Sequence, residues 1–445
     1  MKSKCSPRRR HPLAVAPLVI LLMTSPDAWN QEPAAPAIPA PESSYSLEAL
    51  VAEALEKNPE LRFYDAEILA AKSGLKTAGL LPNPELSGGV GVNRQRFGGL
   101  SAEGVAWSVS VVQPFEWPGR ISLRKAIANH DIELARLGRD RFRSALAGRV
   151  RTLAYGLFAA QERSAAATEV AERFRSLRET LVQRDPAGLT PLLEMRVIEA
   201  TEVNAQRRAG AAEVALQSAL LELNQLRGAA VGAPLVVSPT HLTFPPPKDR
   251  TEWVALALAN SFELKARALE LEQQGFRVDL ARNERYPTLS IGPSYSVQEA
   301  GTEEQRILGV GISLPLPLWN RNKGNIDAAA ARRTQAEVAF SISERETVRN
   351  VLEAAMTYET KRREIGNWRP DSVGHFRNAA EVADRHYRLG AVPISTYVEL
   401  QKQYLDAVES LLDTQKEALE AAARLETLTG VSVQPSPAVP TEDRP

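Results

Sequence analysis

Two segments of the chain alternate between apolar residues and small or polar ones. The first alternates alanine and serine with the apolar residues Val105, Trp107, Val109 and Val111. The second alternates glycine and serine with Leu308, Val310, Ile312 and Leu314. A period of two over about ten residues suits a membrane strand as well as a half-buried strand of a soluble protein. The pattern predicts two β-hairpins, one at about 85–115 and one at about 288–316.

Long stretches between the hairpins predict helices. The stretch from Ile121 to about Gln183 lacks proline and would reach about 95 Å as one helix. Its counterpart from about Lys323 to Arg388 contains Gly366 and Pro370, so we expect a kink or break there. The segment that follows carries apolar residues spaced by three and four positions, which favours coiled-coil packing. These residues are Tyr397, Leu400, Tyr404, Val408 and Leu411.

The order helix, hairpin, long helix, turn, helix occurs twice. ALEKNPELRF from Ala54 aligns with ALANSFELKA, which begins 203 residues later. PFEWPGR from Pro114 aligns with PLPLWNR, 201 residues later, so that Arg120 corresponds to Arg321. Self-similarity of this length indicates an internal repeat. Each repeat opens with a helix that ends before a proline, expected at about Ser46–Leu81 and Thr251–Arg285.

The N-terminus lies outside the repeats. A basic start is followed by the apolar stretch Leu13–Met23, which is typical of a secretory signal peptide and too short for a membrane helix. No later stretch offers the ~20 apolar residues of such a helix, so any membrane span would be made of strands. The expected organisation is a signal peptide at 1–28, a Pro/Ala-rich linker at 29–45, repeats at 46–228 and 251–430, a linker at 229–250 and a flexible tail at 431–445.

The composition argues against nucleic-acid binding and against a catalytic or metal site. Lys+Arg and Asp+Glu number 54 each, so no net charge favours a nucleic-acid partner. The only cysteine, Cys5, leaves with the signal peptide, and the histidines are scattered singly. We therefore expect no catalytic, metal or cofactor site, and we expect that the protein is not an enzyme.

Four predicted strands cannot close a barrel alone. A four-stranded sheet in lipid leaves two unpaired edges, and each unsatisfied backbone group there costs several kcal/mol. Two copies would give eight strands, a barrel filled by its own side chains. Three copies give twelve strands and an open lumen. If the strands lie in a membrane, the strand count therefore predicts a homotrimer.

Two motifs carry a family resemblance. The PNPELS segment at 82–87 and the VVQPFEWPGR segment at 111–120 resemble the TolC family of outer-membrane factors. The resemblance extends from about residue 46 to residue 430. The turn after the second strand is similar to that of heavy-metal efflux members of the CzcC type. Some relatives carry a lipidated cysteine at the mature N-terminus, which this chain lacks.

The resemblance implies a mixed, mainly α fold. Long coiled-coil-like helical hairpins would form a periplasmic tunnel, and each chain would give four strands to a trimeric, 12-stranded transmembrane β-barrel in outer-membrane lipid. The implied function is a passive exit duct of a Gram-negative bacterium, with heavy-metal cations as the expected cargo. Its implied partners are a periplasmic adaptor and an inner-membrane RND-type pump. The alternatives are a channel for drugs or other organic compounds, and a periplasmic coiled-coil adaptor or scaffold that is not a channel.

Candidate site residues fall into three groups. The turns between paired helices would form the periplasmic tip and dock the adaptor, or act as ordinary hairpin turns; their residues are Gly188, Pro191, Gly390 and Pro393. The resemblance places a possible acidic constriction of the lumen near the tip, at Glu194 and Glu399, although both could be ordinary solvated glutamates. Helix-to-strand transitions are expected at Pro84, Pro114, Pro287 and Pro315, with Arg120 and Arg321 as possible anchors.

Overall fold

The computed structural model describes residues 44–97, 100–184, 192–238, 242–368, 372–433 and 436–437. All of them belong to one compact unit, Ser43–Pro445. The expected signal peptide and nearly all of the expected linker at 29–45 lie outside the described residues.

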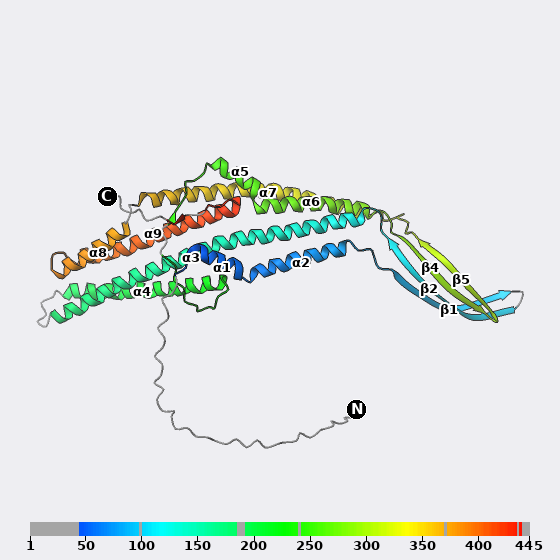
Figure 1. The fold of residues 1–445 in the computed structure, drawn as a ribbon, viewed down its shortest axis with the longest axis horizontal. Coiled ribbons are helices and arrows are strands. Elements are labelled where there is room, and N and C mark those ends of the chain that lie inside the picture. Colours follow the sequence, from blue (N-terminus) through cyan, green and yellow to red (C-terminus); the bar gives the residue numbers. More distant parts are fainter. Residues whose placement is uncertain are drawn as a thin grey trace, which may run out of the picture. The chain divides into compact units, whose positions relative to one another are not determined.

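The described elements follow the same order in each half of the chain (Figure 1). The first half contains α1 (Leu47–Lys57), α2 (Glu60–Ala78), β1 (Glu85–Phe97), β2 (Leu100–Phe115), α3 (Arg120–Arg184) and α4 (Leu192–Leu226). After the short strand β3 (Leu242–Thr243), the second half contains α5 (Arg250–Asn260), α6 (Phe262–Asn283), β4 (Leu289–Ala300), β5 (Glu303–Ser313), α7 (Lys323–Asn367), α8 (Ser372–Arg388) and α9 (Ile394–Thr429). A last strand, β6, covers Ser436–Pro437. The mixed, mainly helical fold class is confirmed.

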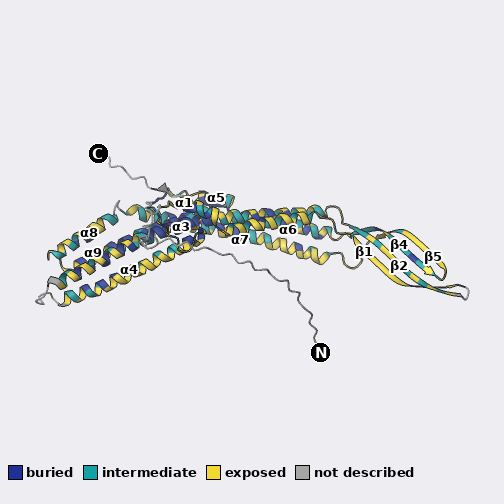
Figure 2. Ribbon diagram, turned by 60° about the horizontal axis from the view of Figure 1, so that its bottom comes forward, coloured by how far each residue is buried: buried dark blue, intermediate teal, exposed yellow. Residues whose placement is uncertain are grey.

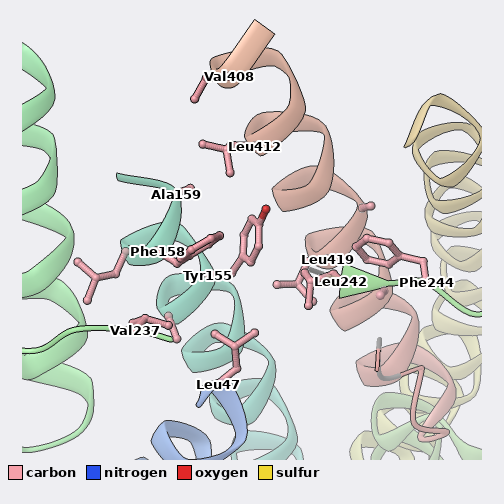
Figure 3. Packing of buried hydrophobic residues seen from close by; sticks show 14 of the residues in the cluster. Leu47, Tyr155, Phe158, Ala159, Val237, Leu242, Phe244, Val408, Leu412 and Leu419 are labelled. Atoms are coloured by element: carbon pink, nitrogen blue, oxygen red, sulfur yellow. The ribbon is translucent and has the colours of Figure 1, made fainter. Parts of the chain in front are cut away.

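Helix α3, with 65 residues, is the element against which α1, α2, α4, α6 and α9 pack. Its middle supplies much of the core: Tyr155 and Leu157 are fully buried. Figure 3 shows Tyr155 between α3 and α9, close to Leu412. The Tyr155 hydroxyl donates a hydrogen bond to Oε1 of Gln415 at 2.5 Å. Among the described helices, none combines the length and the apolar character needed to cross a membrane.

The single helices expected at 46–81 and 251–285 are each broken in two, so this expectation is wrong. Pro59 disfavours helical backbone at Asn58, which is extended (φ −61°, ψ 123°). The buried Asn58 side chain then accepts from the backbone of Glu60 and donates to the carbonyl oxygen of Leu226, both at 2.8 Å. In the second half Ser261 stands between α5 and α6 and caps α6. The break expected near Gly366 and Pro370 is confirmed, because α7 ends at Asn367.

The four long strands form one antiparallel sheet in the order β1-β2-β4-β5. Residues paired across it include Val90 with Trp107, Trp107 with Val297, and Tyr295 with Leu308, and these side chains define what we term the apolar face. The opposite face, termed the small-residue face, carries mainly serine and glycine. Its pairs include Ser87–Ser110, Ser110–Ser294 and Ser294–Gly309. Within the described ranges β1 and β5 each pair with a single strand, and Figure 2 shows their residues largely exposed.

Part of the expected C-terminal tail is ordered. Ser436 and Pro437 pair antiparallel with Thr243 and Leu242, so the expectation of a flexible tail over 431–445 is wrong for these two residues. Leu242 is buried, and its backbone polar groups require partners away from water. Tyr45, the last residue of the expected linker at 29–45, likewise forms a parallel bridge with Val237.

Candidate functional site

The turn between α8 and α9 is closed by Gly390. This glycine has a left-handed backbone (φ +74°), which an alanine would adopt only with strain. Its N–H donates to the carbonyl oxygen of Tyr387, and the N–H of Ala391 donates to that of His386, both at 2.9 Å. These two bonds form a Schellman motif, which satisfies the last carbonyl groups of α8. Gly188 and Pro191, expected in the corresponding turn of the first half, lie outside the described residues.

A pocket of about 520 Å³ lies beside this turn. It draws on the end of α3, the start of α4, the end of α8 and the start of α9. Its lining includes Leu177, Leu181, Glu194, Tyr387, Gly390 and Pro393. Three of the candidate residues, from both halves of the chain, therefore share one pocket.

The two candidate glutamates occupy different surroundings. Glu194 is half-buried in the pocket, and its charge, after the larger effect of burial, raises the pKa of the Tyr387 hydroxyl. Glu399 is exposed on α9, where it accepts a hydrogen bond from Nε2 of Gln403 at 2.6 Å. It does not line the pocket. Within one chain the two carboxylates are thus not part of a single site.

Sequence reasoning missed a cluster that ties α8 and α9 to α3 near this pocket. Tyr397 is fully buried, with its ring 5.4 Å from that of Tyr387 and 5.2 Å from that of Phe174. Burial raises the pKa of its hydroxyl. Arg173 of α3 donates to the buried Gln401 at 3.2 Å and lies 3.5 Å from Glu381 of α8. The spacing of apolar residues indicated that Tyr397 is buried, but it carries no signal for charged pairs between separate helices.

The four candidate prolines lie at or near strand ends. Pro84 directly precedes β1, and Pro287 precedes β4 by two residues. Pro315 follows β5 by two residues. Pro114 lies inside β2, one residue before its end and opposite Ser290 of β4. This proline therefore occupies the strand itself at the transition.

Arg120 joins the two halves of the chain where helices meet strands. Although only 9% exposed, it has no carboxylate partner among the described residues and donates to neutral oxygens at the end of α6 and in the segment that leads to β4. The acceptors are Oδ1 and O of Asn283 at 3.1 and 3.2 Å, O of Tyr286 at 2.9 Å and Oγ1 of Thr288 at 3.3 Å. Nearby, the Trp117 ring stacks on Tyr286 at 4.8 Å. Arg321 is exposed, so the two expected anchors differ.

The described part of the chain contains no group of three or more His, Cys, Asp or Glu side chains placed to hold a metal ion.

Comparison with known proteins places this geometry in a family. A family model described as "Outer membrane efflux protein" matches residues 50–229 and 253–431. The cobalt-zinc-cadmium resistance protein CzcC of Cupriavidus metallidurans is 24% identical over 386 residues, which cover 86% of this chain and 90% of that protein.

Solved structures share the fold. The CmeC outer membrane channel of Campylobacter jejuni matches with a TM-score of 0.70 at 16% identity, over 89% of this chain and 87% of that one. CusC matches with a TM-score of 0.67 at 14% identity, over 87% and 92%. The two segments matched by the family model coincide with the two halves that carry one hairpin each. The chain belongs to the outer membrane efflux protein family, which confirms its resemblance to the TolC family.

Proposed function

We propose that three copies of this outer membrane efflux protein close into one channel, a passive exit duct that performs no chemistry. The observation that carries the proposal is the sheet with two open edges, β1 and β5. Backbone groups left unpaired in lipid cost several kcal/mol each, so the edge of one copy needs the edge of the next. Three copies supply twelve strands, enough to leave a lumen.

The two faces of the sheet support this closure. The apolar face exposes large side chains such as Val90, Leu308 and Val310, which are 83%, 80% and 73% exposed in the single chain. In the proposed barrel this face contacts lipid. The small-residue face then lines the lumen with serine hydroxyls and glycine. Alternation of this kind is the pattern of a membrane barrel with a polar interior.

The cargo of the duct is proposed to be divalent heavy-metal cations. The similarity to a cobalt-zinc-cadmium resistance protein supports this class. Glu194 supplies a carboxylate in the pocket beside the turn at Gly390, and Glu399 supplies one further along α9. Three copies would give two acidic rings, which favour cations. A periplasmic adaptor and an inner-membrane RND-type pump would deliver the cargo to this end of the helices, which would stand in the periplasm.

Ion selectivity in planar bilayers tests the acidic rings. The wild-type channel is expected to prefer cations, and the double variant Glu194→Gln/Glu399→Gln should shift the cation-to-anion permeability ratio towards unity. Glu172 is an exposed glutamate of α3 that belongs to neither ring. Glu172→Gln therefore provides a control and should keep the wild-type permeability ratio. An unchanged ratio in the double variant rules out the rings.

Growth of a deletion strain tests the cargo. Loss of the gene should lower tolerance to zinc, cobalt and cadmium, and the wild-type gene should restore it. Tolerance to detergents and dyes should not change. Sensitivity to organic compounds alone would replace the metal assignment with a channel for organics. Recovery of the protein as a soluble periplasmic monomer would refute the channel.

A further inference from the structure

The contact made by Arg120 joins the first repeat to the second. Arg120 opens the long helix α3, and its acceptors lie at the last residue of α6 and in the segment that links α6 to β4. The contact is reciprocal, because Nδ2 of Asn283 donates to the carbonyl oxygen of Pro118 at 3.0 Å. The start of a long helix in one repeat is thus fastened to the helix–strand segment of the following repeat.

The same position in the second repeat has no binding partner among the described residues of its own chain. Arg321 corresponds to Arg120 in the aligned PLPLWNR and PFEWPGR segments. It is exposed, and the described part of the chain provides it with no hydrogen bond or ion pair. Leu318, which corresponds to Trp117, is 61% exposed and the adjacent Trp319 is 93% exposed, whereas Trp117 stacks on Tyr286. This face of the second repeat is therefore left uncovered within the described residues.

In the matching segment of the first repeat, the carbonyl oxygens of Leu80 and Pro82 already accept from Arg124 and Gln113, at 3.2 and 2.9 Å, but the positions that match Tyr286 and Thr288 are open. With the spacing of 203 residues that aligns Pro84 with Pro287, Tyr286 corresponds to Asn83 and Thr288 to Glu85. Both Asn83 and Glu85 are exposed, and within the described residues the Glu85 carboxylate has no ion-pair partner. One copy therefore presents two unpaired groups. Arg321 stands at the repeat position of the donor Arg120, and Glu85 stands at the repeat position of the acceptor Thr288.

We propose that Arg321 binds the helix–strand segment of the neighbouring copy, with its guanidinium on the Glu85 carboxylate and the carbonyl oxygen of Asn83. The proposal rests on the trimeric channel proposed above and identifies the residues that fasten its chains together. A trimer then has six equivalent junctions around the ring, where helices meet strands. Three are made by Arg120 within chains and use neutral acceptors. Three are made by Arg321 between chains and include an ion pair.

Charge reversal tests the junction. Arg321→Glu and Glu85→Arg should each lower the temperature at which detergent-solubilised trimers dissociate by several degrees. The double variant Arg321→Glu/Glu85→Arg should recover most of that loss, because the pair is restored with its charges exchanged. If a single variant yields no trimer at all, the return of trimers in the double variant is the readout. Added salt should reduce the difference in dissociation temperature between the wild-type and Arg321→Glu trimers, because it screens the ion pair.

A control of equal charge separates this contact from a general effect of charge. Lys323 is exposed two residues further along, and Lys323→Glu combined with Glu85→Arg should show no recovery. The proposed junction is refuted if Arg321→Glu trimers dissociate at the wild-type temperature. It is also refuted if the control pair recovers stability as well as Arg321→Glu/Glu85→Arg does. Light scattering of the wild-type protein distinguishes the two proposals. A wild-type monomer refutes the trimeric channel itself, whereas a stable trimer indifferent to Arg321→Glu refutes only the junction.

Discussion

The internal repeat predicts how the open edges of the sheet pair between neighbouring copies. Within the chain, β2 pairs with β4 so that Val109 faces Tyr295. The repeat carries Val109 onto Val310 of β5 and Tyr295 onto Val92 of β1. We therefore expect Val310 of one copy to face Val92 of the next. Both side chains lie on the apolar face, so this register keeps the apolar side chains of both strands on one side of the sheet. A slip by one residue would turn the apolar side chains of one strand to the opposite face.

Cysteine substitutions at these two positions provide the perturbation. Residues directly opposite in antiparallel strands have Cβ atoms about 4.5–5.5 Å apart, whereas diagonal neighbours are about 7–8 Å apart. A disulfide needs about 3.5–4.5 Å, so only the direct pair can form one with a small shift. In a single chain β1 and β5 are separated by β2 and β4. At about 4.8 Å per strand they are roughly 14 Å apart, which excludes a bond within one chain.

Oxidation of outer membranes followed by non-reducing electrophoresis is the assay. The sequence has no cysteine besides Cys5, in the expected signal peptide, so the background is low. Val92→Cys/Val310→Cys should give covalent dimers and trimers that reducing agent dissolves. Val90→Cys/Val310→Cys keeps both cysteines on the apolar face but shifts the pair by two residues, and it should react weakly. Stronger cross-linking of this shifted pair would refute the register derived from the repeat.

Three further predictions concern single residues. Gly390→Ala should destabilise the chain by about 1 kcal/mol in thermal unfolding, because its backbone is left-handed, whereas Gly366→Ala in α7 should not. Arg151 is buried and pairs with the exposed Glu48 at 2.8 Å and with the less exposed Glu426 at 3.5 Å, so Arg151→Met should cost about 1 to 3 kcal/mol in denaturant unfolding, mainly because Glu426 loses its partner. His130 has a raised pKa: burial lowers it, but the carbonyl oxygen of Ala126 and Glu272 more than compensate. The protonated His130 stabilises the fold fully below the pKa it has in the unfolded chain, and this stabilisation is lost as pH rises through the pKa it has in the folded protein. In thermal melts, His130→Gln should therefore remove this part of the pH dependence of the melting temperature.

The elements with strong periodicity could be predicted from the sequence. The uninterrupted stretch that forms α3 and the alternation in β2 and β5 are local patterns, so they need no knowledge of distant residues. The breaks at Asn58 and Ser261 were missed because each lies in a stretch that reads as helix on both sides. Only the Asn58 break has a local signal, the following proline. The pairing of Ser436 with Thr243 joins residues far apart in the chain and has no local signal at all.

The candidate site was predicted less completely than the fold. Gly390 and Pro393 could be placed in a turn from residue type alone. The shared pocket could not, because it needs the relative position of four helix ends. Two of the four acceptors of Arg120 are backbone carbonyl oxygens, those of Asn283 and Tyr286, and every residue carries such a group. Residue identity therefore does not reveal them, although the repeat indicates where Arg120 and Arg321 lie.

The small-residue face of the sheet has a consequence for conductance. Serine hydroxyls such as those of Ser87 and Ser110, 2.8 Å apart, hold water on the wall but carry no fixed charge. In the proposed barrel, a hydrated ion that passes these hydroxyls would keep its own water shell. In the proposed trimer, the electrical resistance of the duct would therefore arise mainly among the longer side chains of the helices, and widening the strand segment should leave the current nearly unchanged.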